Sequence, residues 1–314
     1  MKDKYFKEAC IVGYGNHAKK KILPALKKSS IKLKYIVTSQ NIKIKNIKIF
    51  SSIQQSLEWL KKNTLIIICT PPSAHYKQIS YFLINGFDII VEKPIALNNY
   101  QINKILNLRK KHKNILIENF MYEYTDIFKK NIDFYNKYKN SIYRIDMNFI
   151  IPNLNYKSFR NIDIKSNSFI FDIGCYILSY LNHLSIRIPF SKLLKVKKNI
   201  KKQSNFLVSF KNYNNVYINI SFGYNTEYLN NIKFYTKNKI VKYDYFFSGI
   251  KSKKIIFTNF KNKVNKSYIY DKNGFEVIFN KNKLFWQKSQ LLRNAQFKAN
   301  TNMLTNLMNC YNNY

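Results

Sequence analysis

Short apolar runs alternate with helix-like segments through the first 120 residues. The run at 64–70, TLIIICT, is apolar enough to be buried on both faces, as central strands of parallel sheets are. Strict alternation of strand and helix implies right-handed βαβ units. The sequence therefore predicts an α/β fold that begins with a Rossmann-like, doubly wound parallel sheet in residues 1–120. Its strands are expected at 8–15, 33–39, 64–70, 88–92 and 115–119.

The pattern changes after residue 120. A helix is expected at 125–138, a strand at 142–152, and a largely buried helix at 168–184. Between 204 and 282, strand-like runs are separated by turns rich in Asn and Lys, as in the hairpins of an antiparallel sheet. The tail from 285 to 314 reads as helical. The sequence therefore predicts a second, α+β domain at 121–314 with an open, mostly antiparallel sheet.

The chain carries 54 Lys and Arg against 16 Asp and Glu, a formal net charge of +38. Such a charge suits a nucleic-acid-binding protein, whose DNA binding would depend steeply on salt. However, the lysines are spread along the whole chain together with many Asn, Ile, Tyr and Phe residues. A biased amino-acid composition explains that mixture, so no nucleic-acid partner is expected. Whether the charge has another role stays open.

Other broad features indicate a cytoplasmic protein. The longest apolar run contains Asp172, which a membrane would penalise, and the N-terminus lacks the pattern of a signal peptide. Cys10, Cys69, Cys175 and Cys310 lie far apart, as expected of reduced thiols. No cluster of His, Cys and Asp has metal-ligand spacing, so no metal is expected.

The first expected strand ends in GYGNHA, a match to G-x-G-x-x-G/A. Gly13 permits a tight turn, and Gly15 permits a pyrophosphate to approach the backbone at the start of the following helix. Asn16 and His17 lie in the same turn and are further candidates for cofactor binding. The alternative is a plain strand-to-helix turn, but its place in an alternating β/α region favours a dinucleotide site.

The second expected strand ends in Thr38 and Ser39, where an acidic residue would hold the ribose 2′-hydroxyl of NAD. Neutral hydroxyls there, with Lys43 nearby, would tolerate a 2′-phosphate and mildly favour NADP. These residues could also merely begin a loop. NAD, NADP or the use of both therefore stays open.

Three other loops leave strands at the carboxyl edge of the sheet, where ligands bind in doubly wound folds. Thr70, Pro71 and His75 follow the third long strand, and His75 could touch a cofactor or merely cap a helix. Glu92 and Lys93 leave the fourth, where Pro94 fixes the turn, and Asn119 ends the fifth. Lys93 could bind the nicotinamide ribose and a substrate oxygen, or form a surface pair with Glu92.

The segment FDIGCY places Asp172, Gly174 and Tyr176 in alternation within an apolar stretch. Together with GYGNHA and VEKP, it resembles the glucose–fructose oxidoreductase, inositol dehydrogenase and rhizopine-catabolism (Gfo/Idh/MocA) family over most of the chain. Many members carry a glycine-rich run where this chain has Ser-Asn-Ser at 166–168, and many carry His in place of Tyr176. The resemblance implies a C-terminal domain that binds substrate and pairs subunits into a dimer or tetramer.

The resemblance also implies roles for individual residues. Lys93 and Tyr176 would be catalytic, while Asp172, Arg160 and Tyr122 would contact or orient the substrate. An ammonium close to a phenol lowers the pKa of the phenol, whereas burial raises it. We hypothesise that Lys93 polarises the substrate oxygen and assists proton exchange by Tyr176.

The sequence thus predicts an NAD(P)-dependent oxidoreductase acting on the CH–OH group of a sugar or sugar derivative. A nucleotide-linked sugar of surface polysaccharide synthesis is one option. Two alternatives stay open. One is a cofactor-binding sensor or structural protein without turnover, and the other is a reductase of a cyclic diol or an imine.

Overall fold

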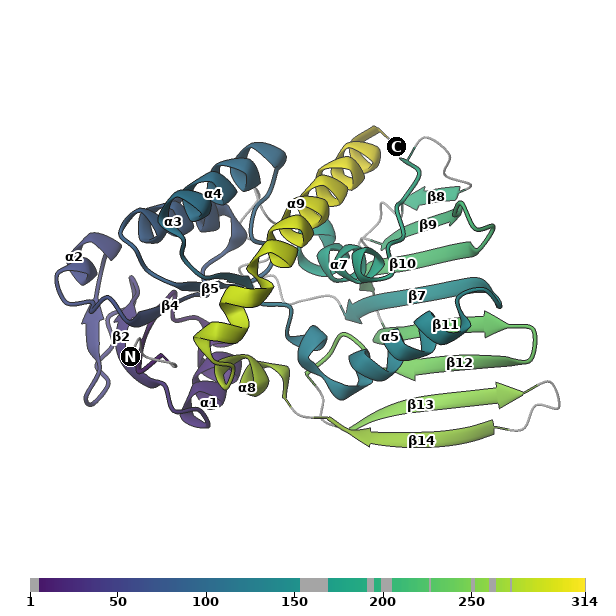
Figure 1. Ribbon diagram of the computed structural model, residues 1–314, viewed down its shortest axis with the longest axis horizontal. Coiled ribbons are helices and arrows are strands. Elements are labelled where there is room, and N and C mark those ends of the chain that lie inside the picture. The colour runs from purple at the N-terminus through teal and green to yellow at the C-terminus, as the bar shows by residue number, and fades with distance from the viewer. Residues whose placement is uncertain are drawn as a thin grey trace. The chain divides into compact units, whose positions relative to one another are not determined.

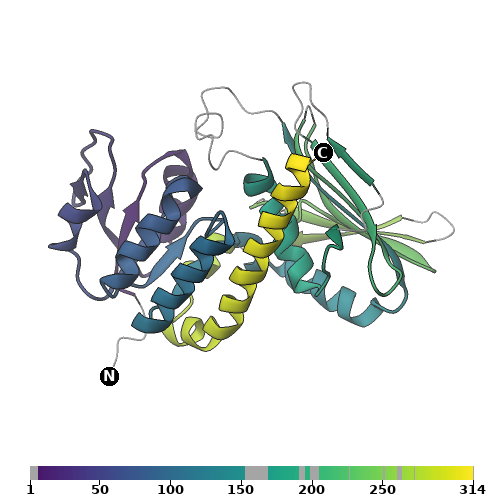
Figure 2. The same ribbon diagram turned by 90° about the horizontal axis from the view of Figure 1, so that it is seen from above.

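The computed structural model describes residues 6–152, 169–190, 195–198, 205–225, 227–249, 252–259, 264–271 and 273–313. The chain divides into two compact units, drawn from two sides in Figures 1 and 2. The first unit comprises Met1–Phe120 and Phe275–Thr301, and the second comprises Met121–Gly274 and Asn302–Tyr314. The second unit differs from the expected domain at 121–314, since the segment at 275–301 returns to the first unit.

The first unit contains a six-stranded sheet with the order β3-β2-β1-β4-β5-β6, and every adjacent pair is parallel. The predicted doubly wound parallel sheet is therefore confirmed. The strand β3 was not predicted, because three residues between lysine-rich turns carry no period that a sequence can reveal. The strands are β1 Glu8–Val12, β2 Lys32–Val37, β3 Lys48–Phe50, β4 Thr64–Ile68, β5 Ile89–Val91 and β6 Leu116–Glu118.

Helices cover this sheet, with α3 and α4 above the strands and α1 below them in Figure 1. All residues of β4 are buried, as its unbroken apolar run predicted. Side-chain caps fix two helix starts, because Ser52 accepts from the amide of Gln55 and Asn98 accepts from that of Gln101. The helices are η1 Ala18–Ile22, α1 Leu23–Lys27, α2 Ile53–Leu57, α3 Pro72–Ile84 and α4 Asn99–His112.

The C-terminal helices are α8, Gly274–Phe279, and α9, Lys283–Asn313, which confirms a helical tail. The side chain of Gln290 on α9 is buried and pairs with β6, the last strand of the sheet. Its Oε1 accepts from the amide of Leu116 at 3.1 Å, and its Nε2 donates to the carbonyl of Leu116 at 3.0 Å. One side chain thus replaces the neighbouring strand that this edge lacks.

The second unit is built on an eight-stranded sheet with the order β14-β13-β12-β11-β7-β10-β9-β8. Its strands pair antiparallel except for β7 with β10, which confirms the predicted open, mostly antiparallel sheet. The lysine-rich cluster at 195–198 forms the edge strand β8, which was not predicted. The strands are β7 Ile142–Pro152, β8 Lys195–Lys198, β9 Asn205–Lys211, β10 Tyr217–Asn225, β11 Leu229–Thr236, β12 Lys239–Asp244, β13 Ser252–Asn259 and β14 Val264–Tyr270.

One face of this sheet packs against helices η2 Met121–Tyr124, α5 Asp126–Tyr138, η3 Ile170–Gly174 and α7 Cys175–His183. Phe134 of α5 packs on Phe234 and Tyr243 at ring distances of 5.6 and 6.3 Å. At Gly174 a Cβ atom would lie 2.8 Å from the ring of Phe222, so glycine lets the helix approach β10 closely. This close packing holds η3 and α7 firmly on the sheet.

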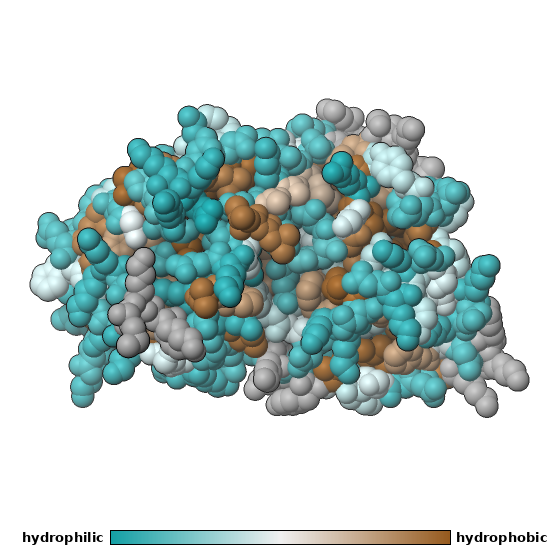
Figure 3. All heavy atoms as spheres, in the orientation of Figure 1, coloured by the Kyte–Doolittle hydropathy of each residue, from teal (hydrophilic) through white to brown (hydrophobic). Residues whose placement is uncertain are grey.

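None of the helices in the described residues combines the length and hydropathy that a membrane span requires. On the face drawn in Figure 3, hydrophilic side chains are spread over both units with small hydrophobic patches between them.

Gln290→Leu should reduce the free energy of unfolding of the first unit. The substitution leaves the amide and carbonyl of Leu116 without their partner, at about 1–3 kcal/mol for each unsatisfied group. Urea unfolding and hydrogen exchange of the Leu116 amide would measure the loss. Gln287→Leu, an exposed position one turn earlier on α9, is the matched control. Equal stability of the two variants would contradict the edge-pairing role.

Candidate functional site

The glycine turn after β1 is shaped by its neighbours. Gly13 has φ +88°, and a Cβ atom there would lie 2.8 Å from Cγ2 and 2.9 Å from the amide nitrogen of Thr70. Its own amide donates to the carbonyl of Val37 at 2.9 Å. Both the backbone angle and the contact with Thr70 therefore require glycine.

Gly15 faces open space, because no atom lies within 4 Å of a Cβ atom built there. Asn16 and His17 are exposed, while Ala18 is buried where the helix packs on the sheet. The turn thus leaves room beside its backbone at the start of a helix. A pyrophosphate requires such room, and the residues present fit a dinucleotide.

Glu92 joins this turn to the ends of two other strands. Its Oε1 lies 2.9 Å from Nε2 of His17 and accepts from Nδ2 of Asn119 at 2.6 Å. Burial acts to raise the pKa of Glu92, but the charge and hydrogen bond of His17 oppose it. The charge of Lys93 and the bond from Asn119 add to that effect, so the pKa of Glu92 is lowered overall and the carboxylate form is favoured.

His75 is fully buried and braces two loops. Its Nδ1 lies 2.9 Å from the carbonyl oxygen of Pro94, and its Nε2 lies 2.9 Å from that of Thr70. Burial lowers the pKa of His75 although both carbonyls favour its charged form. Both ring nitrogens thus face backbone carbonyls, and the contact of His75 with a cofactor stays a prediction. Thr70 and Pro71 lie just before α3. The hydroxyl of Thr70 also donates to Oε1 of Gln78 on this helix at 2.6 Å.

Glu118 is a site-supporting residue that the sequence analysis missed. It is buried at the end of β6, and its Oε1 accepts from the amide of Ile95 at 2.8 Å. It thereby fixes the chain just after the cis peptide bond between Lys93 and Pro94. The sequence feature that could have indicated Glu118 is its position as an acidic residue in the otherwise apolar run ILIE.

At the end of β2, Thr38 is buried and Ser39 is exposed. The hydroxyl of Thr38 accepts from the amide of Gln40 at 3.2 Å. The ammonium of Lys19 donates to the side chain of Gln40 at 3.2 Å, so a cation that the sequence analysis did not select lies beside this strand end. The arrangement offers hydroxyls and a positive charge where a cofactor ribose would lie in this fold.

In the second unit, Asp172 and Tyr176 stand four residues apart on η3 and α7 and are half-buried. The hydroxyl of Tyr224 donates to Oδ2 of Asp172 at 3.0 Å, a partner that nothing in the sequence indicated. The Tyr176 ring lies 5.3 Å from Phe149 and 6.0 Å from Phe247, both edge-on. Aromatic rings thus restrict the phenol from the sheet side.

Tyr122 lies 5.8 Å from the Tyr176 ring but is itself fully buried. Its hydroxyl donates to Ser179 at 3.1 Å, and Ser179 donates to Glu123 at 2.8 Å. Tyr122 therefore supports Tyr176 from within the core, and its direct contact with substrate stays a prediction. Arg160 and the Ser-Asn-Ser segment at 166–168 lie outside the described residues.

Among the residues described, no group of three or more His, Cys, Asp or Glu side chains is placed to hold a metal ion. Cys10, Cys69 and Cys175 are free thiols.

Glu92→Gln should lower the stability of the first unit by about 1–3 kcal/mol at pH 7, because His17 and Asn119 lose a charged acceptor. The lowered pKa means that wild-type Glu92 contributes stability above its ordinary value of 4.5. That contribution is lost as the pH falls below 4.5 through the folded-state pKa, so the two proteins should converge in acid. Thermal unfolding between pH 3 and pH 8 measures this, with the exposed Glu58→Gln as control. A constant difference across this range would contradict the assignment.

The fold of the whole chain is shared with solved structures. KijD10, a 3-ketoreductase from Actinomadura kijaniata, matches with a TM-score of 0.78 at 14% identity, over 96% of this chain and 97% of the reductase. An aldose-aldose oxidoreductase from Caulobacter crescentus matches with a TM-score of 0.78 at 13% identity, over 99% and 97% of the two chains. An oxidoreductase from Bacillus cereus gives a TM-score of 0.68 at 15% identity, with 95% of each chain covered. At these identities the likeness concerns the fold.

Comparison of the sequence with protein families gives a match within the first unit. No curated protein sequence matches the chain. Residues 7–120 match the family model described as an oxidoreductase family with an NAD-binding Rossmann fold. These residues contain both the glycine turn and the Glu92–Lys93–Pro94 loop, so the resemblance drawn from those motifs is confirmed. The sequence match to the Gfo/Idh/MocA oxidoreductases therefore covers the NAD-binding Rossmann domain of this chain.

Proposed function

We propose that this protein transfers a hydride between a nicotinamide cofactor and a hydroxyl or carbonyl group of a sugar or sugar derivative. The supporting observation is the shared carboxylate of Glu92, which joins His17 of the glycine turn to Asn119 at the end of β6. This contact gathers three cofactor candidates at the carboxyl edge of one parallel sheet, where dinucleotides bind in this fold. When bound there, the nicotinamide supplies the hydride donor or acceptor.

Lys93 follows Glu92 directly and is half-buried. The contact of His75 with the carbonyl of Pro94 and the hydrogen bond that the amide of Ile95 donates to Glu118 restrict the backbone around it. A restricted ammonium at this edge can donate to a substrate oxygen and stabilise the negative charge that develops on it. We assign Lys93 this polarising role.

Tyr176 exchanges the proton of the reacting oxygen in this proposal. Its ring is held by Phe149, Phe247 and Tyr122, so the phenol has little freedom to turn. Asp172, one helical turn earlier, orients the substrate by accepting hydrogen bonds from its hydroxyl groups. The Asp172 carboxylate already accepts such a bond from the hydroxyl of Tyr224. A carboxylate has further acceptor positions, which suits a polyhydroxylated ligand.

For the cofactor we propose NADP ahead of NAD. The end of β2 carries the hydroxyls of Thr38 and Ser39 and no carboxylate that would repel a 2′-phosphate. Lys19 lies beside that strand end through Gln40. The crystal structures of KijD10 contain NADP, which agrees with this choice.

For the substrate we propose a sugar, with a nucleotide-linked sugar as the first candidate. KijD10 is a 3-ketoreductase crystallised with TDP-benzene, and the Caulobacter enzyme is an aldose-aldose oxidoreductase. The crystallised variants of KijD10 replace a tyrosine or a lysine, the same residue types that we assign here. Assembly into a dimer or tetramer and a cytoplasmic location stay predictions.

Lys93→Ala and Tyr176→Phe should each reduce kcat at least about a hundredfold, since each removes a group that acts on the reacting oxygen. Absorbance of the reduced nicotinamide, recorded with a panel of free and TDP-linked sugars and keto-sugars, measures turnover. Lys110→Ala and Tyr213→Phe, at exposed positions, are the matched controls. Near-normal turnover in either site variant refutes its role. Cofactor binding without turnover of any sugar by the wild type would favour a sensor.

Gly15→Val should abolish or weaken cofactor binding by at least about tenfold while the unliganded fold is kept. The added side chain enters open space, so it meets no protein atom near its Cβ, yet it fills the room that a pyrophosphate needs. Nicotinamide fluorescence titration and thermal unfolding, with and without NADP, separate the two effects. Gly249→Val is the control for a glycine change away from the turn, because a Cβ atom there would meet only Cε of Met121 at 3.8 Å. Unchanged NADP affinity in Gly15→Val would exclude this turn as the pyrophosphate site.

A further inference from the structure

Lys253 of β13 is the only buried lysine or arginine in the described part of a chain with 54 such residues. Its side chain is 0% exposed, and burial lowers its pKa while Asp271 acts to raise it. Burying two charges is unfavourable unless their surroundings compensate. The pair formed by Lys253 and Asp271 therefore needs an explanation.

The ammonium of Lys253 has two partners in the second unit. Its Nζ lies 3.2 Å from Oδ2 of Asp271, an ion pair, and donates to the carbonyl of Phe246 at 3.4 Å. Phe246 belongs to the turn 245–248 after β12, where the neighbouring amide of Phe247 donates to Asn230 at 2.9 Å. Lys253 and Asn230 thus hold the two adjacent phenylalanines of this turn from opposite ends of one peptide group.

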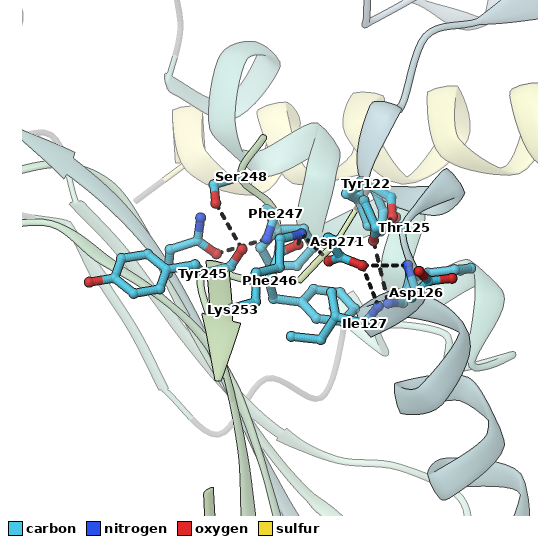
Figure 4. Close-up of polar contacts among 12 residues, drawn as sticks. Tyr122, Thr125, Asp126, Ile127, Tyr245, Phe246, Phe247, Ser248, Lys253 and Asp271 are labelled. Atoms are coloured by element: carbon cyan, nitrogen blue, oxygen red, sulfur yellow. Dashed lines mark hydrogen bonds and ion pairs between the residues drawn. The ribbon is translucent and has the colours of Figure 1, made fainter. Parts of the chain in front are cut away.

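Asp271 connects the pair to α5. Its Oδ1 accepts from the amides of Asp126 and Ile127 at 2.7 and 3.2 Å, at the first turn of that helix. Just before the helix, Thr125 bonds back to the carbonyl of Tyr122 through both its amide and its hydroxyl. Figure 4 shows Lys253 and Asp271 between the turn at Phe246–Phe247 and the start of α5.

Both connections end at the same ring. Phe247 lies 6.0 Å from Tyr176, and Tyr122 lies 5.8 Å from it. Phe247 and Tyr122 also pack edge-to-face on each other at 5.2 Å, and Phe247 stacks on Phe149 at 5.2 Å. Movement of the turn or of the segment before α5 would therefore displace the rings that confine Tyr176.

We propose that the buried Lys253–Asp271 ion pair is a positioning element, which holds the Phe247 and Tyr122 rings and through them orients the phenol of Tyr176. The inference rests on the proposed function in that Tyr176 is taken as the proton-exchanging group. The ion pair itself touches neither substrate nor cofactor in this role. It fixes the two chain segments that form the wall behind the phenol.

The test uses a pair of variants that separates positioning from stability. Lys253→Met leaves the Asp271 carboxylate buried without its cation, so both stability and turnover should fall. The double variant Lys253→Met/Asp271→Asn removes both charges and keeps an oxygen that accepts from the amides of α5. Its melting temperature should return toward that of the wild type. Its kcat should stay about tenfold or more below wild type, with cofactor affinity unchanged, because the bond to Phe246 is still absent.

A spectroscopic readout makes the test independent of activity. With 3-fluorotyrosine placed at position 176 alone, ¹⁹F NMR should give one sharp resonance in the wild type and a shifted or split resonance in the double variant. Lys254→Met is the matched control, since Lys254 points to the opposite face of β13 and lies over the Tyr268 ring. It should match the wild type in every measurement.

Two results would overturn the proposal. One is a double variant whose kcat recovers together with its melting temperature, because the pair would then serve stability alone. The other is an unchanged fluorotyrosine resonance in the double variant. If the wild type shows no turnover with any sugar, the oxidoreductase function fails instead, and the resonance alone decides whether the pair positions Tyr176.

Discussion

The candidate cofactor site depends on one shared carboxylate. Glu92 ends a buried strand, and a single oxygen of its side chain meets both the imidazole of His17 and the amide of Asn119. Burial alone would favour a neutral acid, but these partners outweigh it and keep the pKa of Glu92 low. The Glu92 carboxylate therefore holds three strand ends in a fixed relation. It also fixes the backbone position from which the Lys93 side chain extends. Without this contact the glycine turn and the loop that carries Lys93 would be independent features of the sheet edge.

The second unit uses a different means for a similar purpose. Tyr176 is confined by aromatic rings, and the polar groups that hold those rings lie one layer further into the core. Asp172 receives its partner from β10, so the helix that carries both candidate residues is tied to the sheet by a hydrogen bond as well as by packing. In both units the candidate catalytic side chains Lys93 and Tyr176 are half-buried, while their neighbours His75 and Tyr122 are fully buried.

The sequence was sufficient for features with a local signal. Unbroken apolar runs such as β4 predicted the parallel sheet, and the glycines of the first turn predicted a strand-to-helix connection that the structure contains. The supporting contacts could not be predicted, because they join distant residues. Gln290 pairs with a strand 174 residues earlier in the chain, and Asp271 caps a helix 145 residues before it. Lys253 carries no signal in a chain so rich in lysine, and only its burial distinguishes it.

The return of Gln290 to the first sheet has a consequence for synthesis on the ribosome. The strand β6 is complete once residue 118 has emerged, but the side chain that pairs with its outer edge follows 174 residues after Leu116. At translation rates of about 5–20 residues per second, the edge waits roughly 9–35 seconds for its partner. During that interval the nascent domain presents an open strand to other chains, a state that chaperones recognise and that favours misassembly. Completion of the NAD-binding domain is thus coupled to the emergence of α9 from the ribosome.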